Sequence, residues 1–171
     1  MKDLTNLKTF IIDSPNPREI DDAISLEIIE DNIKKLWIHI SNPCKLFLTD
    51  SKIDIDARNR SSSLYLIDQY IPMLPDSIID MANLTQNKLS NTISASIDFN
   101  DDGSIDKYEL VEAKIKPKYQ LTYEDADEII ELEPKEEKDL IDLKNLLMKS
   151  IYYRKTKGAI TFDISTTNIE L

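Results

Sequence analysis

The sequence predicts an α+β domain in which helices pack on a mixed, largely antiparallel sheet. Three observations carry this prediction. Apolar and polar residues alternate through much of the first two thirds of the chain, as they do in half-buried strands. The last third instead spaces its leucines along one face of a helix. The 171 residues suffice for one ordinary domain with a real core, and no internal repeat divides them.

The opening segments predict three strands. Residues 10–12 form a continuous apolar run, typical of a strand buried on both faces. Residues 14–17 contain two prolines, which require an extended loop. Residues 24–28 and 36–40 alternate as a pair of half-buried strands, and Glu30-Asp-Asn32 is the turn between them.

The middle of the chain predicts a short helix and a hairpin. Ser51 followed by Asp54 resembles a capping box and predicts a helix over about residues 52–59. Residues 65–74 are expected to be irregular, because prolines interrupt and follow them. Residues 93–116 read as two strands joined at an Asp-Asp-Gly turn.

The last third predicts two helices. Thr122 is placed to cap a short helix that stops before Pro134, and Pro134 suits the first turn of a longer helix. Gly158 is placed to end that helix, and residues 159–164 look like one more strand. The apolar stripe of the longer helix consists of Leu140, Leu143, Leu147 and Ile151.

Composition favours a cytoplasmic protein without a membrane span. No apolar run approaches the length of a transmembrane helix, and Met1-Lys2-Asp3 opens no signal peptide. Cys44 is the only cysteine, which fits a reducing compartment. The net charge of −11 argues against a nucleic-acid partner, although lysines and arginines cluster at residues 114–118 and 154–157.

Acidic residues concentrate after the first predicted strand. Asp13, Glu19, Asp21 and Asp22 fall within ten residues. Carboxylate oxygens suit Mg²⁺ or Mn²⁺, and a pair of such ions can clamp the attacking and leaving oxygens of a phosphodiester. Spacing alone leaves a solvated acidic loop as an equal interpretation.

A second acidic segment, residues 98–109, matches the ligand positions of an EF-hand loop. Asp98 and Glu109 take the first and last of these positions, with Gly103 at the turn. An EF-hand needs a helix on each side, whereas these flanks alternate with a period of two and contain β-branched residues. The segment therefore predicts a hairpin with an acidic turn, and a calcium-binding module stays open as an alternative.

Five ordered segments resemble the catalytic domain shared by ribonuclease II and ribonuclease R, the RNB domain. The first contains the four acids, Ile12-Asp13 and Glu19-Ile-Asp-Asp-Ala-Ile-Ser25. The others are Leu36-Trp-Ile-His-Ile40, Asp56-Ala-Arg-Asn-Arg-Ser-Ser-Ser-Leu-Tyr-Leu66, Ile71-Pro-Met-Leu-Pro75 and Leu121-Thr-Tyr-Glu-Asp125. Their order and spacing agree with the family over essentially the whole chain.

This resemblance implies a 3′→5′ exoribonuclease that hydrolyses single-stranded RNA to nucleoside 5′-monophosphates with Mg²⁺. DNA is not an expected substrate. The resemblance assigns Asp13, Glu19 and Asp22 to metal coordination, and places Asp21 nearest the second metal or the attacking water. Asp21 and Asp22 are thus the expected catalytic residues.

The resemblance also implies three RNA-binding residues. Tyr65 aligns with an aromatic residue that stacks on a base near the RNA 3′ end, and Tyr123 with one in the nucleotide pocket. Arg60 is positioned to reach a phosphate or, equally, to hold the neighbouring acids. His39, the only histidine, shares a strand face with Trp37 and is expected to be structural.

The chain departs from the family pattern at two places, Glu19 where Asp is usual and Ser41-Asn42 where Ala-Asp is common. A non-catalytic RNA-binding or scaffold relative with a decayed site is therefore the alternative function. The resemblance implies that residues 1–171 correspond to the N-terminal portion of an RNB catalytic domain, without its second half or the oligonucleotide-binding barrels that flank it. We accordingly expect this segment alone to have little nuclease activity.

Overall fold

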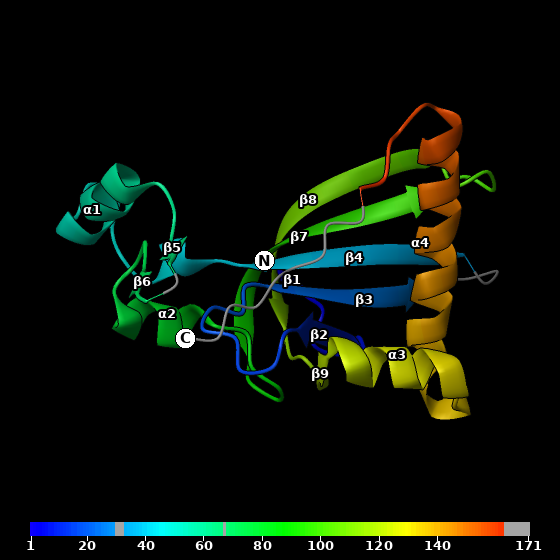
Figure 1. Cartoon of the computed structure of the whole chain (residues 1–171), viewed down its shortest axis with the longest axis horizontal. Coiled ribbons are helices and arrows are strands. Elements are labelled where there is room, and N and C mark those ends of the chain that lie inside the picture. Colours follow the sequence, from blue (N-terminus) through cyan, green and yellow to red (C-terminus); the bar gives the residue numbers. More distant parts are fainter. Residues whose placement is uncertain (30–32, 67, 163–171) are drawn as a thin grey trace.

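A computed structural model describes residues 1–29, 33–66 and 68–162 (Figure 1). A seven-stranded sheet organises them, in the order β1-β8-β7-β4-β3-β2-β9. Its strands are β1 (Lys2–Asp3), β2 (Thr9–Asp13), β3 (Asp22–Ile28), β4 (Lys34–Ser41), β7 (Ser90–Phe99), β8 (Ile105–Ile115) and β9 (Tyr119–Thr122). The pairs β1–β8 and β2–β9 are parallel and the other neighbours are antiparallel, which confirms the mixed, largely antiparallel sheet.

Two helices cover one face of the sheet, α3 (Tyr123–Leu132) and α4 (Lys138–Thr156). Figure 1 shows α4 lying across β3, β4, β7 and β8. Leu140 and Leu143 of α4 are buried against Phe10, Leu26 and Leu36 from the sheet. The leucine spacing predicted this face, because residues three and four apart lie on one side of a helix.

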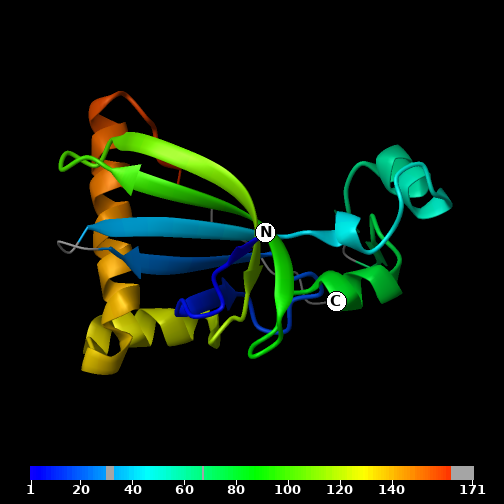
Figure 2. The ribbon, with the colours of Figure 1, turned by 180° about the vertical axis from the view of Figure 1, so that it is seen from behind.

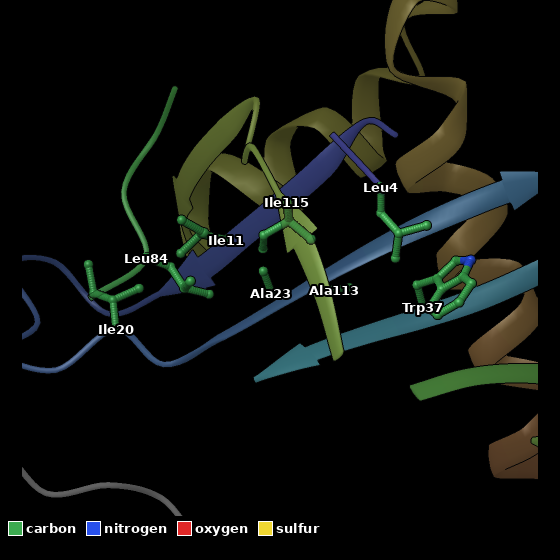
Figure 3. Packing of buried hydrophobic residues seen from close by; sticks show 8 residues of the cluster. All are labelled: Leu4, Ile11, Ile20, Ala23, Trp37, Leu84, Ala113 and Ile115. Carbon is green, nitrogen blue, oxygen red and sulfur yellow. The ribbon is translucent and has the colours of Figure 1, made fainter. Parts of the chain in front are cut away.

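The opposite face of the sheet has a second core around Trp37, which is fully buried (Figure 3). Leu4 and Leu84 reach this core from the segments before β2 and before β7, and Ile11 and Ile115 from the strands. Since residues 10 and 11 face opposite cores, the continuous apolar run is explained by a strand that is buried on both faces.

The segment between β4 and β7 folds into a separate group, which we call the lobe (residues 42–66 and 68–83). Figures 1 and 2 show it projecting beyond one end of the sheet. It contains a 3₁₀ turn (Pro43–Lys45), α1 (Lys52–Arg60), β5 (Leu64–Tyr65), β6 (Tyr70–Ile71) and α2 (Asp76–Ala82). Its own small core consists of Ala57, Leu74, Ile78 and Ile79.

Helix α1 confirms the predicted short helix, with a modified cap. The Asp54 backbone N–H donates to Ser51 Oγ at 3.4 Å, as a capping box requires. The Asp54 carboxylate, however, accepts from the backbone N–H of Asp50 at 2.7 Å rather than from that of Ser51. The box is therefore only half formed, because the Asp54 carboxylate is engaged by the backbone of Asp50.

The hairpin β7–β8 confirms the prediction for residues 98–109, whose flanks are strands and not EF-hand helices. Asp98 forms ion pairs with Lys35 at 3.7 Å and Lys107 at 3.4 Å. Gly103 has φ +85°, and a Cβ there would lie 2.4 Å from the carbonyl oxygen of Lys149 in α4. The glycine is needed because the hairpin turn lies directly against that helix.

Three predictions of elements need correction. The region 65–74, predicted to be irregular, includes β6 and the end of β5, and the helix α2 that follows was missed. The long helix begins at Lys138, after a 3₁₀ turn that follows Pro134. Residues 159–162 form no strand because no neighbouring strand pairs with them; residues 163–164, like the turn predicted at 30–32, lie outside the described residues.

Candidate active site

Two strand ends bring the first and last acids to the same end of the sheet. Asp13 is the last residue of β2, and Asp22 is the first residue of its antiparallel neighbour β3. The register pairs only Thr9 with Ser25 and Phe10 with Ile24, so the two strands are unpaired toward the acids. The loop that contains the other two acids therefore closes an opening between strand ends.

Hydrogen bonds from residues distant in sequence hold the backbone of this acidic loop. The backbone N–H of Ser41 donates to the carbonyl oxygen of Asp21 at 2.7 Å. Asn83 accepts from the backbone N–H of Ile20 at 3.0 Å, and its amide donates to the carbonyl oxygen of Arg18 at 3.1 Å. Sequence reasoning missed Asn83, because its role depends on partners 63 and 65 residues away and no local motif marks it.

The acids on the strand ends interact through their charges. Desolvation raises the pKa of Asp22, and the negative charges of Asp21 and Asp13 raise it further. The Asp13 carboxylate accepts from the backbone N–H of Ser14 at 2.6 Å. Mutual repulsion of this kind is relieved by a bound cation, and these oxygen donors match the preference of Mg²⁺ or Mn²⁺.

A complete metal site is nevertheless not assembled within residues 1–29, 33–66 and 68–162. No group of three or more His, Cys, Asp or Glu side chains in these ranges lies close enough to hold an ion. The structure thus brings Asp13, Asp21 and Asp22 near enough for their charges to interact, but it does not place them as a finished set of ligands. The chemistry of the donors fits a divalent cation.

Glu19 points toward the lobe and is held by it. Its Oε1 accepts from Ser63 Oγ at 2.6 Å and from the hydroxyl of Tyr70. Burial and the interaction with Glu19 raise the pKa of Tyr70, so this hydroxyl stays a donor. A hollow of about 110 Å³ lies between Glu19, Asp21 and the lobe. It has room for several waters but is too small for a nucleotide.

Both predicted tyrosines are accessible beside these acids. Tyr65 is 63% exposed, and its ring centroid lies 5.1 Å from that of Tyr70. Desolvation and the charge of Glu19 raise the pKa of Tyr65. Tyr123 is 55% exposed and begins α3, directly after Thr122, which pairs with Asp13 in the parallel β2–β9 ladder. The register thus explains why Tyr123 lies beside Asp13, whereas Tyr65 is placed by the lobe.

The contacts of Arg60 contradict one of the two roles that the sequence left open for it, that of holding the neighbouring acids. Its Nη1 donates to the carbonyl oxygen of Pro72 at 2.7 Å, so it fastens α1 to the chain after β6 and does not hold the neighbouring acids. Arg58 instead contacts acids, with Asp50 Oδ1 at 2.5 Å and Asp54 Oδ2 at 2.9 Å. Arg58 contacts acids and Arg60 does not because positions two apart face different sides of a helix.

His39 is structural, as predicted. It is fully buried, and its ring stacks beside that of Trp37 with centroids 6.3 Å apart. Its Nε2 lies 2.8 Å from Ser25 Oγ and its Nδ1 lies 2.8 Å from Ser94 Oγ, so it links three adjacent strands. Burial lowers its pKa to about 4, which keeps the ring neutral near pH 7.

Fold and site together define an α+β domain with an acidic strand-end loop flanked by exposed tyrosines. The family model of the RNB domain matches residues 1–171. The chain therefore belongs to the RNB domain family.

Three known proteins are similar to it. Ribonuclease II, chloroplastic/mitochondrial, of Arabidopsis thaliana is 34% identical over 170 residues, 99% of this chain and 21% of that protein. Mycoplasma genitalium RNase R in complex with double-stranded RNA superposes with a TM-score of 0.76 at 22% identity, over 91% of this chain and 28% of that one. Yeast Ssd1, described as a pseudonuclease, superposes with a TM-score of 0.67 at 22% identity, over 75% and 16%.

The chain spans about a quarter of the length of the curated relatives it matches. In the portion of the chain that the structure describes, no helix is both long enough and apolar enough to cross a membrane.

Proposed function

We propose that the protein is a 3′→5′ exoribonuclease that hydrolyses single-stranded RNA to nucleoside 5′-monophosphates. The observation that carries this proposal is the acidic loop, with Asp13, Asp21 and Asp22 at the open end of β2 and β3 and their charges in mutual repulsion. RNB family membership and the named ribonucleases among the relatives support the same reaction.

Mg²⁺, or in its place Mn²⁺, is the proposed cofactor, with Asp13, Glu19, Asp21 and Asp22 as the residues that would hold it. When bound, it would neutralise the charge that develops on the phosphate and lower the pKa of a coordinated water. Asp21 would orient the attacking water, whose oxygen bonds to phosphorus as the bond to the 3′ oxygen breaks. Tyr65 would stack on a base near the 3′ end, and Tyr123 would line the nucleotide pocket.

The exposed tyrosines support a substrate of any sequence. Stacking on an aromatic ring contributes about 1–3 kcal/mol per base and every base has a face to offer, so such contacts do not select sequence. The acidic character of the loop also requires a cation between protein and phosphate, since the net charge of −11 would otherwise repel RNA. Arg60 is a further phosphate contact in this proposal.

The test is Asp21→Asn in the full-length protein, assayed for release of mononucleotides from single-stranded RNA in Mg²⁺. We expect hydrolysis to fall at least 1,000-fold, roughly the scale for removing a charged catalytic group, while RNA binding is retained. Asp106→Asn is the matched control, because Asp106 is exposed on β8 and away from the loop. Unchanged hydrolysis in Asp21→Asn would contradict the catalytic role of Asp21, and a full-length parent that binds RNA without hydrolysing it would favour a binding or scaffold protein.

That scaffold alternative is a real one for this fold, since the pseudonuclease Ssd1 shares it. The fold therefore does not carry catalysis by itself, and the acids must be tested. The calcium-binding alternative over residues 98–109 is not favoured, because both flanks are strands. We also propose a cytoplasmic location on the basis of the single cysteine, Cys44.

A further inference from the structure

We propose that Ser63 and Tyr70 are positioning residues for Glu19, and that through them the aromatic surface of the lobe sets the geometry of the acidic loop. This inference rests on the proposed function. It adds two residues that the family resemblance does not assign and gives a physical role to the unusual Glu19.

The first step is the hydrogen bonding of Glu19. Its Oε1 accepts from both Ser63 Oγ and the Tyr70 hydroxyl. Ser63 Oγ in turn accepts from the backbone N–H of Met73 at 2.9 Å, which leaves its own hydrogen directed to Glu19. Because a carboxylate has about four lone-pair sites, two bonds on Oε1 leave Oε2 available to a cation.

The second step is the length of the side chain. An aspartate at position 19 would be shorter by one C–C bond, about 1.5 Å. From the same backbone position it would fall short of Ser63 and Tyr70 and leave both hydroxyls without this acceptor. The extra methylene of Glu19 is therefore what allows this carboxylate to reach Ser63 and Tyr70, 44 and 51 residues away in sequence.

The third step is the environment of the Tyr70 ring. The ring lies 5.1 Å from Tyr65 and 5.0 Å from the guanidinium carbon of Arg18, both measured to its centroid. Tyr70 is thus in contact with the loop through Arg18 and Glu19, and with the exposed Tyr65 on its own hairpin. A base stacked on Tyr65 would extend the same aromatic group whose hydroxyl holds Glu19, so that seating the RNA and orienting the acid would be coupled.

The experiment is Tyr70→Phe in the full-length protein, because phenylalanine keeps the ring and removes only the hydroxyl. Mn²⁺ binding is measured without RNA by electron paramagnetic resonance. We expect the Mn²⁺ dissociation constant to rise about 10-fold, the usual lower scale for losing a partner that orients a metal ligand. The Mg²⁺ concentration for half-maximal hydrolysis should rise by a similar factor, whereas KM for RNA should change less than about 2-fold, because the stacking ring remains.

Two further variants keep the inference testable if Tyr70→Phe folds poorly. Ser63→Ala and Glu19→Asp should each raise the Mn²⁺ dissociation constant. In the double variant, Ser63→Ala should add little to the effect of Glu19→Asp, because the shorter carboxylate at position 19 is already out of reach of Ser63. Tyr108→Phe is the matched control, because Tyr108 is 71% exposed on β8.

Unchanged Mn²⁺ affinity in both Tyr70→Phe and Ser63→Ala would overturn the inference, and a raised KM with unchanged Mn²⁺ affinity would assign these residues to RNA binding instead. The Asp21→Asn variant separates this failure from failure of the proposed function. If Asp21→Asn is inactive while Tyr70→Phe behaves as the parent, only the positioning role is wrong. If Asp21→Asn hydrolyses RNA as fast as the parent, the proposed site is wrong, and if the parent itself does not hydrolyse RNA, the proposed function is wrong.

Discussion

The sheet and the lobe hold their parts of the candidate site in different ways. In the sheet, continuous backbone ladders and two buried cores place Asp13 and Asp22 at strand ends. In the lobe, short elements around four buried side chains place Ser63, Tyr65 and Tyr70, and side-chain hydrogen bonds join Ser63 and Tyr70 to the loop. Asp13 and Asp22 thus lie on the sheet with its two larger cores, and Tyr65 lies on the lobe with its smaller one.

Within our proposal, this difference between the sheet and the lobe has a functional consequence. The strand ends fix Asp13 and Asp22 because Asp13 is paired with Thr122 of β9 and Asp22 with Ile40 of β4. A lobe with little buried surface opens at lower free energy, which suits a surface that must accept and release successive nucleotides. The hydrogen bonds of Glu19 to Ser63 and Tyr70 are one of the contacts by which the two parts meet.

The largest expected effect tests whether the sheet and the lobe unfold separately. Leu143→Ala removes a fully buried side chain between α4 and the sheet, and should lower the free energy of opening by about 4 kcal/mol. Hydrogen exchange should report this loss in β3 and β4, with a much smaller change in α2. Leu74→Ala in the lobe is the counterpart and should affect α1 and α2 first. Equal losses in both parts after either change would make them one cooperative unit.

The next effect is a loss of stability at low pH that comes from His39 in the sheet. His39 titrates at about 4 in the folded chain and near 6.5 when unfolded, so the unfolded state binds more protons between these values. Stability should therefore be fully present above pH 6.5 and fall as pH drops, by about 3 kcal/mol at pH 4. Hydrogen exchange of the backbone amides in β3, β4 and β7, corrected for the pH dependence of the intrinsic exchange rates, measures this loss of stability. His39→Gln should flatten this dependence; an unchanged slope would show that other groups cause it.

A smaller effect tests the contact between the hairpin turn and α4. Gly103→Ala should cost about 2 kcal/mol, because the added Cβ would meet the Lys149 carbonyl oxygen. Gly158→Ala is the matched control, since its φ is +91° but nothing lies within 4 Å of the added carbon. It should cost about 1 kcal/mol through backbone strain alone. Equal losses, measured by thermal unfolding, would mean that the turn does not press on the helix.

The smallest effect is local to the lobe. Ser51→Ala removes the hydroxyl that caps α1 and should cost about 1 kcal/mol, visible as faster exchange of α1 amides with β3 and β4 unchanged. Thr122→Ala removes the equivalent cap of α3, where the full capping box with Asp125 is present. Faster exchange in the strands of the sheet after Ser51→Ala would contradict the separation of the two parts.

Local patterns predicted the sheet well. Residues 10–12, 24–28 and 36–40 lie within β2, β3 and β4, and the hairpin after residue 93 is β7–β8. Leu140, Leu143 and Leu147 of the stripe predicted for α4 pack on the sheet, and the buried His39 was also predicted correctly. Ile151, the last residue of that stripe, is instead 41% exposed. Patterns of this kind are reliable because burial against a sheet imposes a repeat on neighbouring residues. The edge strands β1 and β9 were missed, since each is short and its partner lies far along the chain.

The lobe was predicted less well, apart from α1. Its hairpin and α2 have too few residues to show a repeat, and prolines mark both. Asn83, Ser63 and Tyr70 contact the acidic loop over long sequence separations, which no local pattern records. The same limit made Arg60 look like a partner for acids when Arg58 has that role.

The sequence by itself determined the acidic loop, the strands that flank it and the family to which the chain belongs, because these depend on residue types in a local order. Only the tertiary structure decided which side chains meet. Glu19 reaches across to Ser63 and Tyr70, Asp13 lies beside the start of α3, and Asp21 is fixed by Ser41. These contacts follow from strand register and from how the lobe folds back on the loop, and both are set by packing over the whole chain rather than by neighbours in sequence.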